Sequence, residues 1–488
     1  MNFETMMNLF SRRGILFPSS EIYDNHPSGF WDYGPYGATI KRKLVELWRS
    51  EIVKRTKMIE IDGSICMDAD VFRASGHLQS FSDPLIECSK CGSIFRADKL
   101  IEEVSKEKAP EAMAAEKFDE MIKKHKIKCT NCKSELGKTR KFNMMFKVSI
   151  GASKPQDAYL RPETCQSIFA DFPRLIKVMK KSLPLGIAQV GKSFRNEISP
   201  RNATIRAREF TQAEAEIFFD PNNAEVKNFE DVGDCVLNLK SMKDRGDYLA
   251  VTAKEAIEKK MMSKFAAYYI SILQSFLLKC GIPAEKIRNR QLDDEERAFY
   301  AKESWDTEIK TSLGWVEIVA NNNRTDYDMS AHGKISGKDV SVVNPETNEK
   351  FIPHIWEISM GIDRLFYCVM ETAYKKDGER VYLSLPAYVA PASVAIFPLI
   401  NKDGMPEKAD EVVEKLKKEG LDVETETKDS IGKRYARADE IGIPFCVTID
   451  GETSSDNSVT IRERDTKKQE RVKIKDLARK ITELVSQG

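Results

Sequence analysis

The stretch from Gly191 to Phe219 constrains the fold most, because its pattern predicts two long strands joined by a loop. Residues 209–219 place polar side chains and small or apolar side chains on alternate sides, which is the period of a β-strand. The residues 199–202 between the strands, Ser-Pro-Arg-Asn, favour a turn. An antiparallel hairpin is therefore expected, and one of its faces carries Arg195, Glu197, Arg206, Arg208, Gln212, Glu214 and Glu216.

The charged face of this hairpin indicates what it could bind. So many charges of both signs cannot be buried without partners. Arginine side chains bind phosphates and stack on flat rings, while carboxylates bind amines. We interpret the hairpin as the floor of a site for a phosphorylated, amine-bearing substrate. The alternative is a solvated sheet face whose charges pair with one another.

The composition narrows the class of protein. The 488 residues have room for about two to four domains. The net charge is +1, so any bound nucleic acid must be held by local basic patches. No apolar run is long enough to span a bilayer, and the N-terminal residues do not resemble a secretory signal. Ten cysteines in so long a chain favour a reducing compartment, and a cytoplasmic protein without membrane contact is expected.

Four of the cysteines form two CxxC pairs, Cys88 with Cys91 and Cys129 with Cys132. Four thiolates suit tetrahedral zinc, and a closed four-cysteine site leaves no open position for catalysis. The expected zinc is therefore structural, and the alternative is two pairs of free thiols. A charged segment, roughly 98–124, is expected to be helical and to loop out from the closed site.

Other patterns predict further elements. Apolar residues recur at helical spacing over 38–53 and 259–280, and a second, charge-rich helix is expected over 291–300. Residues 305–319 alternate as two strands. The run 355–364 predicts a strand that turns into a helix at Gly361. An arginine at this junction, Arg364, can lie against a terminal phosphate while the glycine permits close approach. Shorter strands are expected at 59–67 and 142–150, and a helix begins near residues 159–164.

From Leu385 onward, short strands alternate with helices, which predicts a mixed α/β domain over 385–488. Acidic and basic residues almost balance across this domain. Lys433, Arg434 and Arg437 are local candidates for phosphate contact, and the alternative is a solvated helix face. The expected strands are 394–397, 421–427, 445–449, 459–464 and 470–474, and the expected helices are 408–419, 431–441 and 475–485.

The run FRNEISPR, followed by R-x-REF and E-x-E-x-F, resembles motif 2 of the class II aminoacyl-tRNA synthetases, and among them the dimeric glycyl-tRNA synthetases. Two places depart from the family pattern. In the family, the segment before RTDYD is usually apolar and contains a glycine, whereas residues 320–323 of this chain are Ala-Asn-Asn-Asn. Ile358 occupies a position that is usually proline. The resemblance also rests on GFWDYGPYGATIKRKLVELW (29–48), SGHLQSFSDP (75–84), RPET (161–164), GWVEIV (314–319), RTDYDMSAH (324–332), EISMGIDR (357–364) and SIGKRYARADEIGIPFCVTID (430–450).

The resemblance implies an α+β fold, in which an antiparallel sheet flanked by helices forms a catalytic domain over residues 1–384. It implies insertions at about 88–140, with the CxxC pairs, and at about 220–300. Residues 385–488 would form the anticodon-binding domain. The helix expected over 38–53 matches motif 1, which implies a homodimer; the alternative is an ordinary core helix.

The implied activity is the ATP-dependent conversion of glycine to glycyl-adenylate and its transfer to the 3′ end of tRNA(Gly), with Mg²⁺ as cofactor. The implied ATP-binding residues are Arg195, Asn196, Glu197, Ile205, Arg206, Ala207, Arg208, Glu209, Phe210, Glu317, Ile318, Gly361, Ile362, Asp363 and Arg364. The implied glycine-binding residues are Arg96, Glu163, Phe210, Thr211, Gln212, Ala213, Glu214, Glu357, Ile358, Ser359, Met360 and Gly361.

Arg195, Glu197 and Arg364 are the expected catalytic residues. Arg195 would contact the α-phosphate, Arg206 and Arg364 the γ-phosphate end, and Phe210 would stack on adenine. Glu197 and Glu317 would contact the adenine amine or magnesium. His77 is assigned no chemistry. The competing readings are a non-catalytic, nucleic-acid-binding relative, which would be expected to lose the arginines, and a class II synthetase for another amino acid.

Overall fold

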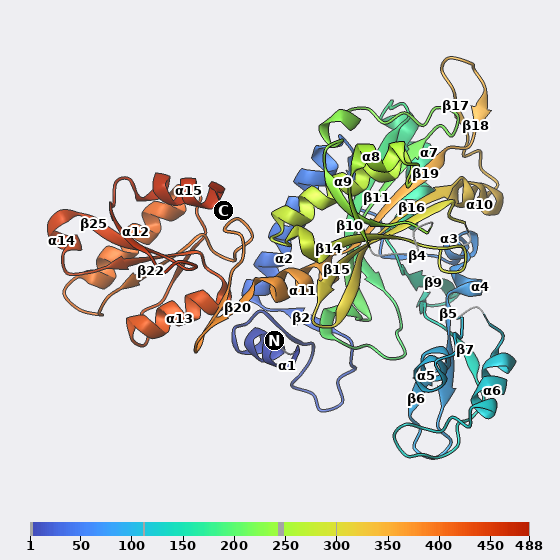
Figure 1. Cartoon of the computed structure of the whole chain (residues 1–488), viewed down its shortest axis with the longest axis horizontal. Coiled ribbons are helices and arrows are strands. Elements are labelled where there is room, and N and C mark those ends of the chain that lie inside the picture. The colour runs from blue at the N-terminus through green and yellow to red at the C-terminus, as the bar shows by residue number, and fades with distance from the viewer. Residues whose placement is uncertain (1–2, 111–112, 243–247, 299, 488) are drawn as a thin grey trace.

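The computed structural model covers the whole chain and describes all residues except 1–2, 111–112, 243–247, 299 and 488. A nine-stranded sheet organises the larger part of the molecule (Figure 1). Its strands are antiparallel except for the pairs β10–β3 and β12–β14. In spatial order they are β13 (Leu249–Thr252), β12 (Val236–Lys240), β14 (Ile287–Gln291), β15 (Glu303–Thr311), β16 (Gly314–Thr325), β19 (His354–Gly361), β11 (Glu209–Phe219), β10 (Leu185–Phe194) and β3 (Ile59–Ile61).

The predicted hairpin is β10–β11, which pairs from Leu185 with Phe218 to Phe194 with Glu209. The connecting residues 195–208 form an irregular loop with one short 3₁₀ turn, Ala203–Ile205. The alternation along β11 directs Ala213, Ala215 and Ile217 away from the polar face and into the core. Charged residues on the other face are thereby presented together, as the period of a strand requires.

Five helices cover the apolar face of the sheet. Their buried side chains, with those of the strands, form the largest hydrophobic core. Helix α9 begins one residue after Ser263, whose hydroxyl accepts from the Ala266 N–H, so it starts later than the predicted residue 259. The helices are α1 (Phe3–Arg12), α2 (Pro35–Trp48), α8 (Ala253–Glu258), α9 (Lys264–Lys279) and α11 (Ile362–Ala373).

The opposite face is only partly covered. Helices α7 (Cys165–Val178) and α10 (Tyr327–Ser336) pack over one half of it, where Phe172 stacks on Phe218 at 3.9 Å between ring centroids. The other half of this face holds the polar residues of β11, β16 and β19.

The helix predicted over 291–300 is wrong for the described residues. Gln291 ends β14 and pairs with Trp305. The Asp293 carboxylate then accepts from the backbone N–H groups of Glu295 and Glu296, which closes a turn. The charged residues here offer no apolar stripe that a helix could bury. Residue 299 lies outside the described part. The expected insertion at 220–300 also supplies β12, β13 and β14, which extend the central sheet.

The segment with the CxxC pairs forms a small module with its own apolar core. The single helix expected over 98–124 is two helices, α5 (Ala97–Ser105) and α6 (Ala115–Lys124). The chain leaves α5 at Lys106, which has φ +62°, and Pro110 follows within the break. The module's strands are β5 (Ser82–Glu87), β6 (Ile94–Arg96) and β7 (Arg140–Asn143).

Residues 393–487 form a five-stranded sheet with helices, as the alternating pattern predicted. Figure 1 shows this domain beside the nine-stranded sheet, with α13 facing α1, and Glu440 of α13 pairs with Arg12 of α1 at 2.6 Å. Its elements are β22 (Val394–Pro398), α12 (Met405–Lys418), β23 (Val423–Thr425), α13 (Ile431–Ile441), β24 (Phe445–Ile449), α14 (Thr453–Asp456), β25 (Ser458–Glu463), β26 (Gln469–Lys473) and α15 (Leu477–Gln487).

The remaining elements are short. The strands predicted over 59–67 and 142–150 are each divided between two sheets, β3 with β4 and β7 with β8. A π-helical turn, Arg49–Lys54, continues α2. In the described chain, no helix combines the length and the apolar character that crossing a bilayer needs. The other elements are β1 (Leu16–Pro18), β2 (Trp31–Tyr33), β4 (Cys66–Asp68), α3 (Ala69–Ala74), α4 (His77–Ser80), β8 (Phe146–Ile150), β9 (Gln156–Leu160), β17 (Val342–Val343), β18 (Lys350–Phe351), β20 (Tyr374–Asp377) and β21 (Arg380–Leu383).

Candidate active site

A cavity of about 240 Å³, open to solvent on one side, lies over the uncovered polar face of β11, β16 and β19. Arginines line one end, and buried carboxylates gather at the other. We call these the arginine end (Arg195, Arg206 and Arg364) and the carboxylate end (Glu163 and Glu357, with Glu214 buried beneath the wall).

At the arginine end, backbone carbonyls orient two of the three guanidinium groups. Arg195 Nε donates to the Pro162 carbonyl at 3.1 Å, and its guanidinium lies 5.4 Å from the ring centroid of Phe210. Arg364, in the first turn of α11, donates to the carbonyls of Ile205 and Glu317 at 3.1 and 3.0 Å. Arg364 Nη1 also lies 3.5 Å from Glu317 Oε2, so this guanidinium has a carboxylate beside it, whereas Arg195 donates to a neutral carbonyl.

Arg206 is held differently. Its Nε donates to Glu197 Oε2 at 2.6 Å, and the two residues line the cavity together. The Arg208 guanidinium points away from the cavity and donates to the backbone carbonyls of Glu197 and Ser28. Arg208 is expected to bind ATP, and in this structure its guanidinium joins the loop to the Ser28 carbonyl.

The start of α11 contains a buried charge pair that sequence reasoning missed. Lys41 Nζ lies 2.7 Å from Asp363 Oδ1, and Tyr33 and the Thr211 N–H also donate to this carboxylate. Burial by itself would raise the pKa of Asp363, but Lys41 and the other donors lower it below its ordinary value. The pair fixes α11 against α2, and with it the position of Arg364.

At the carboxylate end, Glu214 lies beneath the cavity wall and is almost fully buried. Three side chains donate to it: Thr164 at 2.5 Å, Ser359 at 2.5 Å and Gln212 at 3.1 Å. Burial raises the pKa of Glu214, while the hydrogen bonds from Ser359 and Thr164 act in the opposite direction. Ser359 and Gln212 also line the cavity, so the hydrogen bonds to Glu214 connect this buried carboxylate with the cavity surface.

Glu357 lines the cavity and accepts from Arg324 Nη1 at 2.6 Å and from Asn322 Nδ2 at 2.5 Å. Burial raises the pKa of Glu357 to about 7, although Arg324 opposes the shift. Glu163 accepts from Gln166 Nε2 at 2.7 Å, and His77 Nε2 lies 3.6 Å from it. Burial would raise the pKa of Glu163, but the neighbouring His77 brings it well below its ordinary value. His77 therefore has an electrostatic role that sequence reasoning did not assign.

Both departures from the family pattern have a structural place. Ala320 and Asn322 of β16 line the cavity, and Asn322 holds Glu357. Ile358 is fully buried on the opposite face and pairs with strands on both sides. A central strand suits isoleucine here, since its N–H remains available to the sheet.

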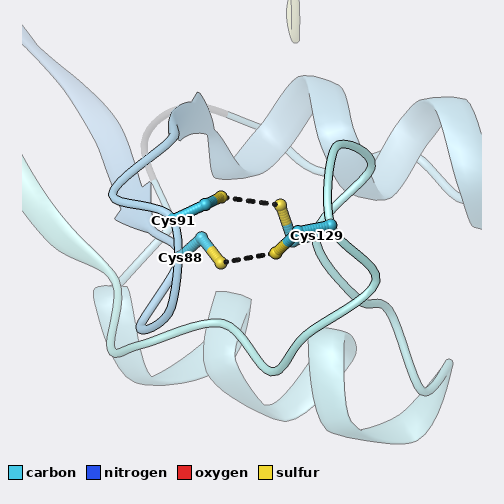
Figure 2. A group of neighbouring side chains, drawn as sticks. Cys88, Cys91 and Cys129 are labelled. Atoms are coloured by element: carbon cyan, nitrogen blue, oxygen red, sulfur yellow. Dashed lines mark hydrogen bonds between the residues drawn. The ribbon is translucent and has the colours of Figure 1, made fainter.

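Figure 2 shows the side chains of Cys88, Cys91 and Cys129 pointing toward one another from two loops. The sulfurs of these three cysteines and of Cys132 all lie within 4.8 Å of one another. The Sγ atoms of Cys88 and Cys132 are 3.5 Å apart, and those of Cys91 and Cys129 are 3.7 Å apart. None of the four is in a disulfide. A tetrahedral zinc ion with Zn–S bonds of about 2.3 Å requires sulfurs about 3.8 Å apart, so the four residues fit that ion.

Comparison with known proteins assigns the fold. Residues 146–373 match the tRNA synthetase class II core domain (G, H, P, S and T), and residues 393–484 match an anticodon binding domain. The glycine–tRNA ligase of Pyrococcus abyssi is 41% identical over 99% of this chain and 98% of its own length. That of Methanocaldococcus jannaschii is 37% identical over 97% of each. The chain belongs to the glycine–tRNA ligase family. This family membership confirms the expected fold class.

Most of the site residues implied by the family resemblance line the cavity. Four lining residues were not predicted: Thr204, Tyr300, Ala320 and Asn322. Asn322 could have been predicted from strand alternation, because it lies four residues after Ile318 and therefore on the same face of the strand. The predicted residues that line the cavity are Glu163, Arg195, Glu197, Ile205, Arg206, Ala207, Phe210, Thr211, Gln212, Glu317, Ile318, Glu357, Ser359, Gly361, Asp363 and Arg364.

Other residues implied by the glycine–tRNA ligase pattern lie outside the cavity. Arg96 lies in a neighbouring depression, where its guanidinium pairs with Asp98 at 2.6 Å and with Asp83 at 3.1 Å. Strand alternation turns Ala213, Ile358 and Met360 toward the core. The predicted residues outside the cavity are Arg96, Asn196, Arg208, Glu209, Ala213, Glu214, Ile358, Met360 and Ile362.

Proposed function

We propose that the protein activates glycine with ATP and transfers the glycyl group to the 3′ end of tRNA(Gly), and that the cavity is its active site. The observation that carries the proposal is the division of charge inside one cavity. Guanidinium groups at one end suit a triphosphate, and carboxylates at the other suit an ammonium group. The full-length similarity to glycine–tRNA ligases points the same way.

In the proposed first step, the glycine carboxylate attacks the α-phosphate of ATP and pyrophosphate leaves. The terminal ribose hydroxyl of the tRNA then attacks the glycyl carbonyl and releases AMP. No protein nucleophile is needed, since catalysis comes from alignment and from cations that stabilise charge on the phosphate. Arg195 contacts the α-phosphate, Arg364 and Arg206 contact the γ-phosphate end, and Phe210 stacks on adenine. Glu197 contacts the adenine amine.

Magnesium fits the carboxylates on β15 and β16. Glu317 lines the cavity and is nearly half exposed, and Asp306 lies on the adjacent strand. Burial, followed by the charge of Glu317, raises the pKa of Asp306 to about 8, which marks a surplus of negative charge. Carboxylate oxygens are the ligands that Mg²⁺ prefers. When bound there, the ion would neutralise phosphate charge.

Glycine recognition then follows from charge and size. Glu357 and Glu163 attract the ammonium group, and the Ser359 hydroxyl borders the same region. Pockets for large apolar substrates admit smaller ones at a cost of only about 1–3 kcal/mol per methylene. Glycine is the smallest amino acid, so the site needs only to exclude larger ones, and a separate editing site is unnecessary.

The C-terminal domain is proposed to bind the anticodon region of the tRNA. Arg434 is not a phosphate contact in this proposal, because it is buried and donates to the backbone carbonyls of Pro398 and Glu426. Arg437 pairs with Glu426 and Asp429. Lys433, with a side chain 70% exposed, is the remaining candidate of the three.

Zinc, dimerisation and location complete the proposal. The four-cysteine cluster holds a structural zinc ion. The chain forms a homodimer in the cytoplasm through the region of α2. The apolar residues Ile40, Leu44 and Trp48 of α2 are buried within their own chain, so the dimer contact would use the other side of the helix.

The test is ATP–pyrophosphate exchange by the purified protein with each of the twenty amino acids. Glycine alone should support exchange, and alanine and serine are the informative controls because they are the next in size. Exchange with another amino acid would reassign the substrate. Absence of exchange, with retained tRNA binding, would favour the non-catalytic reading.

A further inference from the structure

Glu216 is a buried acidic residue that the proposed reaction does not use. It lies on β11 two residues after Glu214 and directly opposite Glu357 on β19. Opposed side chains on neighbouring antiparallel strands have Cβ atoms about 4.5–5.5 Å apart, and like charges at such positions are destabilising. Glu216 is 0% exposed and Glu357 is 4% exposed, so water does not screen the pair.

The two carboxyl groups differ in their partners. Glu357 accepts from Arg324 and Asn322, one donor for each oxygen. Within the described chain, neither oxygen of Glu216 has a hydrogen-bond donor. Oxygens of Glu216 and Glu357 and the Cys165 sulfur all lie within 4.8 Å of one another. The terminal torsion of glutamate is broad, so rotation about it can bring the two carboxyl groups into hydrogen-bond contact.

The surrounding charges do not compensate an ionised Glu216. Arg324 is the neighbouring cation, and it is already bound by two other carboxylates. It pairs with Asp328 at 2.7 and 2.8 Å and with Glu357 at 2.6 Å. An additional buried carboxylate without its own cation is costly, and a carboxyl in that position keeps its proton instead.

We propose that Glu216 is neutral near pH 7 and is a positioning residue that donates its hydroxyl hydrogen to Glu357. The negative charge that attracts the substrate ammonium group then stays on Glu357. Glu216 becomes the third hydrogen-bond donor to Glu357, beside Arg324 and Asn322. The inference rests on the proposed function, because it assigns a role in glycine binding to a group beneath that site.

Every charged neighbour of Glu216 bears on its protonation. Burial raises the pKa of Glu216 well above its ordinary value, Glu357 adds to the shift, and Arg324 opposes it. The groups that face Glu216 are Glu214 on β11, Glu357 on β19, Arg324 on β16, Asp328 on α10 and Cys165 on α7. His332 of α10 is engaged with Gln166 instead.

The kinetic test compares two substitutions of Glu216. Glu216→Gln keeps a donor of the same shape, so the KM for glycine should stay within about threefold of wild type. Glu216→Leu removes the donor, so that KM should rise about tenfold while the KM for ATP is unchanged. Glu214→Gln is the matched control, since it makes the same change two residues earlier at a carboxylate that accepts three hydrogen bonds. It should raise the KM for glycine about a hundredfold.

A second readout follows the proton itself. Infrared spectra of the wild type at pH 7 should contain the carbonyl band of a buried protonated carboxyl, and Glu216→Gln should lack it. A raised pKa in the folded state stabilises the protein below the unfolded pKa, and this stabilisation is lost as pH rises. The Tm of Glu216→Gln minus the Tm of the wild type should therefore increase steadily from about pH 5 to pH 8.

The outcomes separate the two proposals. A missing band, or a glutamine variant as impaired as the leucine variant, overturns the role of Glu216. The infrared and Tm comparisons decide the matter if the leucine variant fails to fold. A wild-type protein without glycine-dependent exchange overturns the proposed function alone, because those two comparisons do not need activity.

Discussion

At the arginine end of the cavity, Arg195 and Arg364 are oriented by neutral backbone carbonyls, whereas at the carboxylate end Glu357 is bound by Arg324. The side chains at the two ends also differ in their exposure to solvent. The Arg364 side chain is 35% exposed, and that of Glu357 is 5% exposed. The arginine end is open, and its ion pairs, Arg206 with Glu197 and Arg364 with Glu317, are partly exposed. The carboxylate end is closed, and its ion pair between Arg324 and Glu357 is buried.

This difference teaches how one sheet face serves two unlike partners. A triphosphate is large and remains partly in water, so it can be bound by semi-exposed cations in an open cavity. The ammonium of a small amino acid offers few contacts, so its binding requires buried carboxylates, where electrostatic attraction is stronger. Buried carboxylates in turn need nearby donors such as Thr164 and Asn322. The following experiments test whether the two ends are independent.

The largest effect is expected at the carboxylate end. Glu357→Gln should raise the KM for glycine about a hundredfold, since an amide does not replace a buried charge partner, while the KM for ATP changes little. The measurement is exchange over both substrate concentrations. Glu51→Gln is the control, because the mostly buried Glu51 pairs with Lys279 and does not line the cavity. Equal loss for both substrates would mean that Glu357 holds the sheet rather than the substrate.

The next effect concerns the arginine end. Arg195→Ala should lower the rate of glycyl-adenylate formation about a hundredfold, since a lost donor to the reacting phosphate typically costs about 3 kcal/mol. Arg201→Ala is the matched control, because Arg201 is an exposed residue of the same loop and does not line the cavity. Single-turnover kinetics without tRNA give the rate. Near-normal adenylate formation by Arg195→Ala would show that the Arg195 side chain has no part in the reaction.

A smaller effect should follow from pH. The pKa of Glu357 is raised to about 7, chiefly by burial, so its protonated fraction grows as pH falls. Protonation removes the charge that attracts the ammonium group. The KM for glycine should therefore rise about tenfold from pH 8 to pH 6, with the KM for ATP nearly constant. Glu357→Gln should lack this dependence. A parallel rise for both substrates would tie the titration to another group.

The smallest effect on the cavity is expected from the zinc module. The purified protein should contain about one zinc ion per chain, and Cys129→Ser should release it and lower the Tm. Exchange without tRNA should fall by no more than about threefold, because the cysteines lie outside the cavity. Metal analysis with thiol titration provides the check. Metal-free wild-type protein with four reactive thiols would contradict the zinc site.

Local patterns in the sequence were enough for the main elements. The alternation over 209–219 predicted β11, and the strand-to-helix junction at Gly361 predicted β19 and α11. The two CxxC pairs predicted the sulfur cluster. These predictions held because strand period, turn chemistry and metal ligands are properties of short stretches. The same reasoning gave a wrong prediction for the charge-rich segment 291–300, because charged residues do not specify a helix without an apolar stripe.

The sequence by itself determined the family, the polar face of the hairpin and the residue types available for phosphate and amine. Only the tertiary structure decided which of them meet. It separated Arg96 and Arg208 from the cavity, joined Lys41 to Asp363, and set Glu216 against Glu357. The physical reason is that these contacts join residues far apart in the chain. Which charge is paired, buried or open to a ligand depends on the packing of sheet and helices, and no local pattern records it.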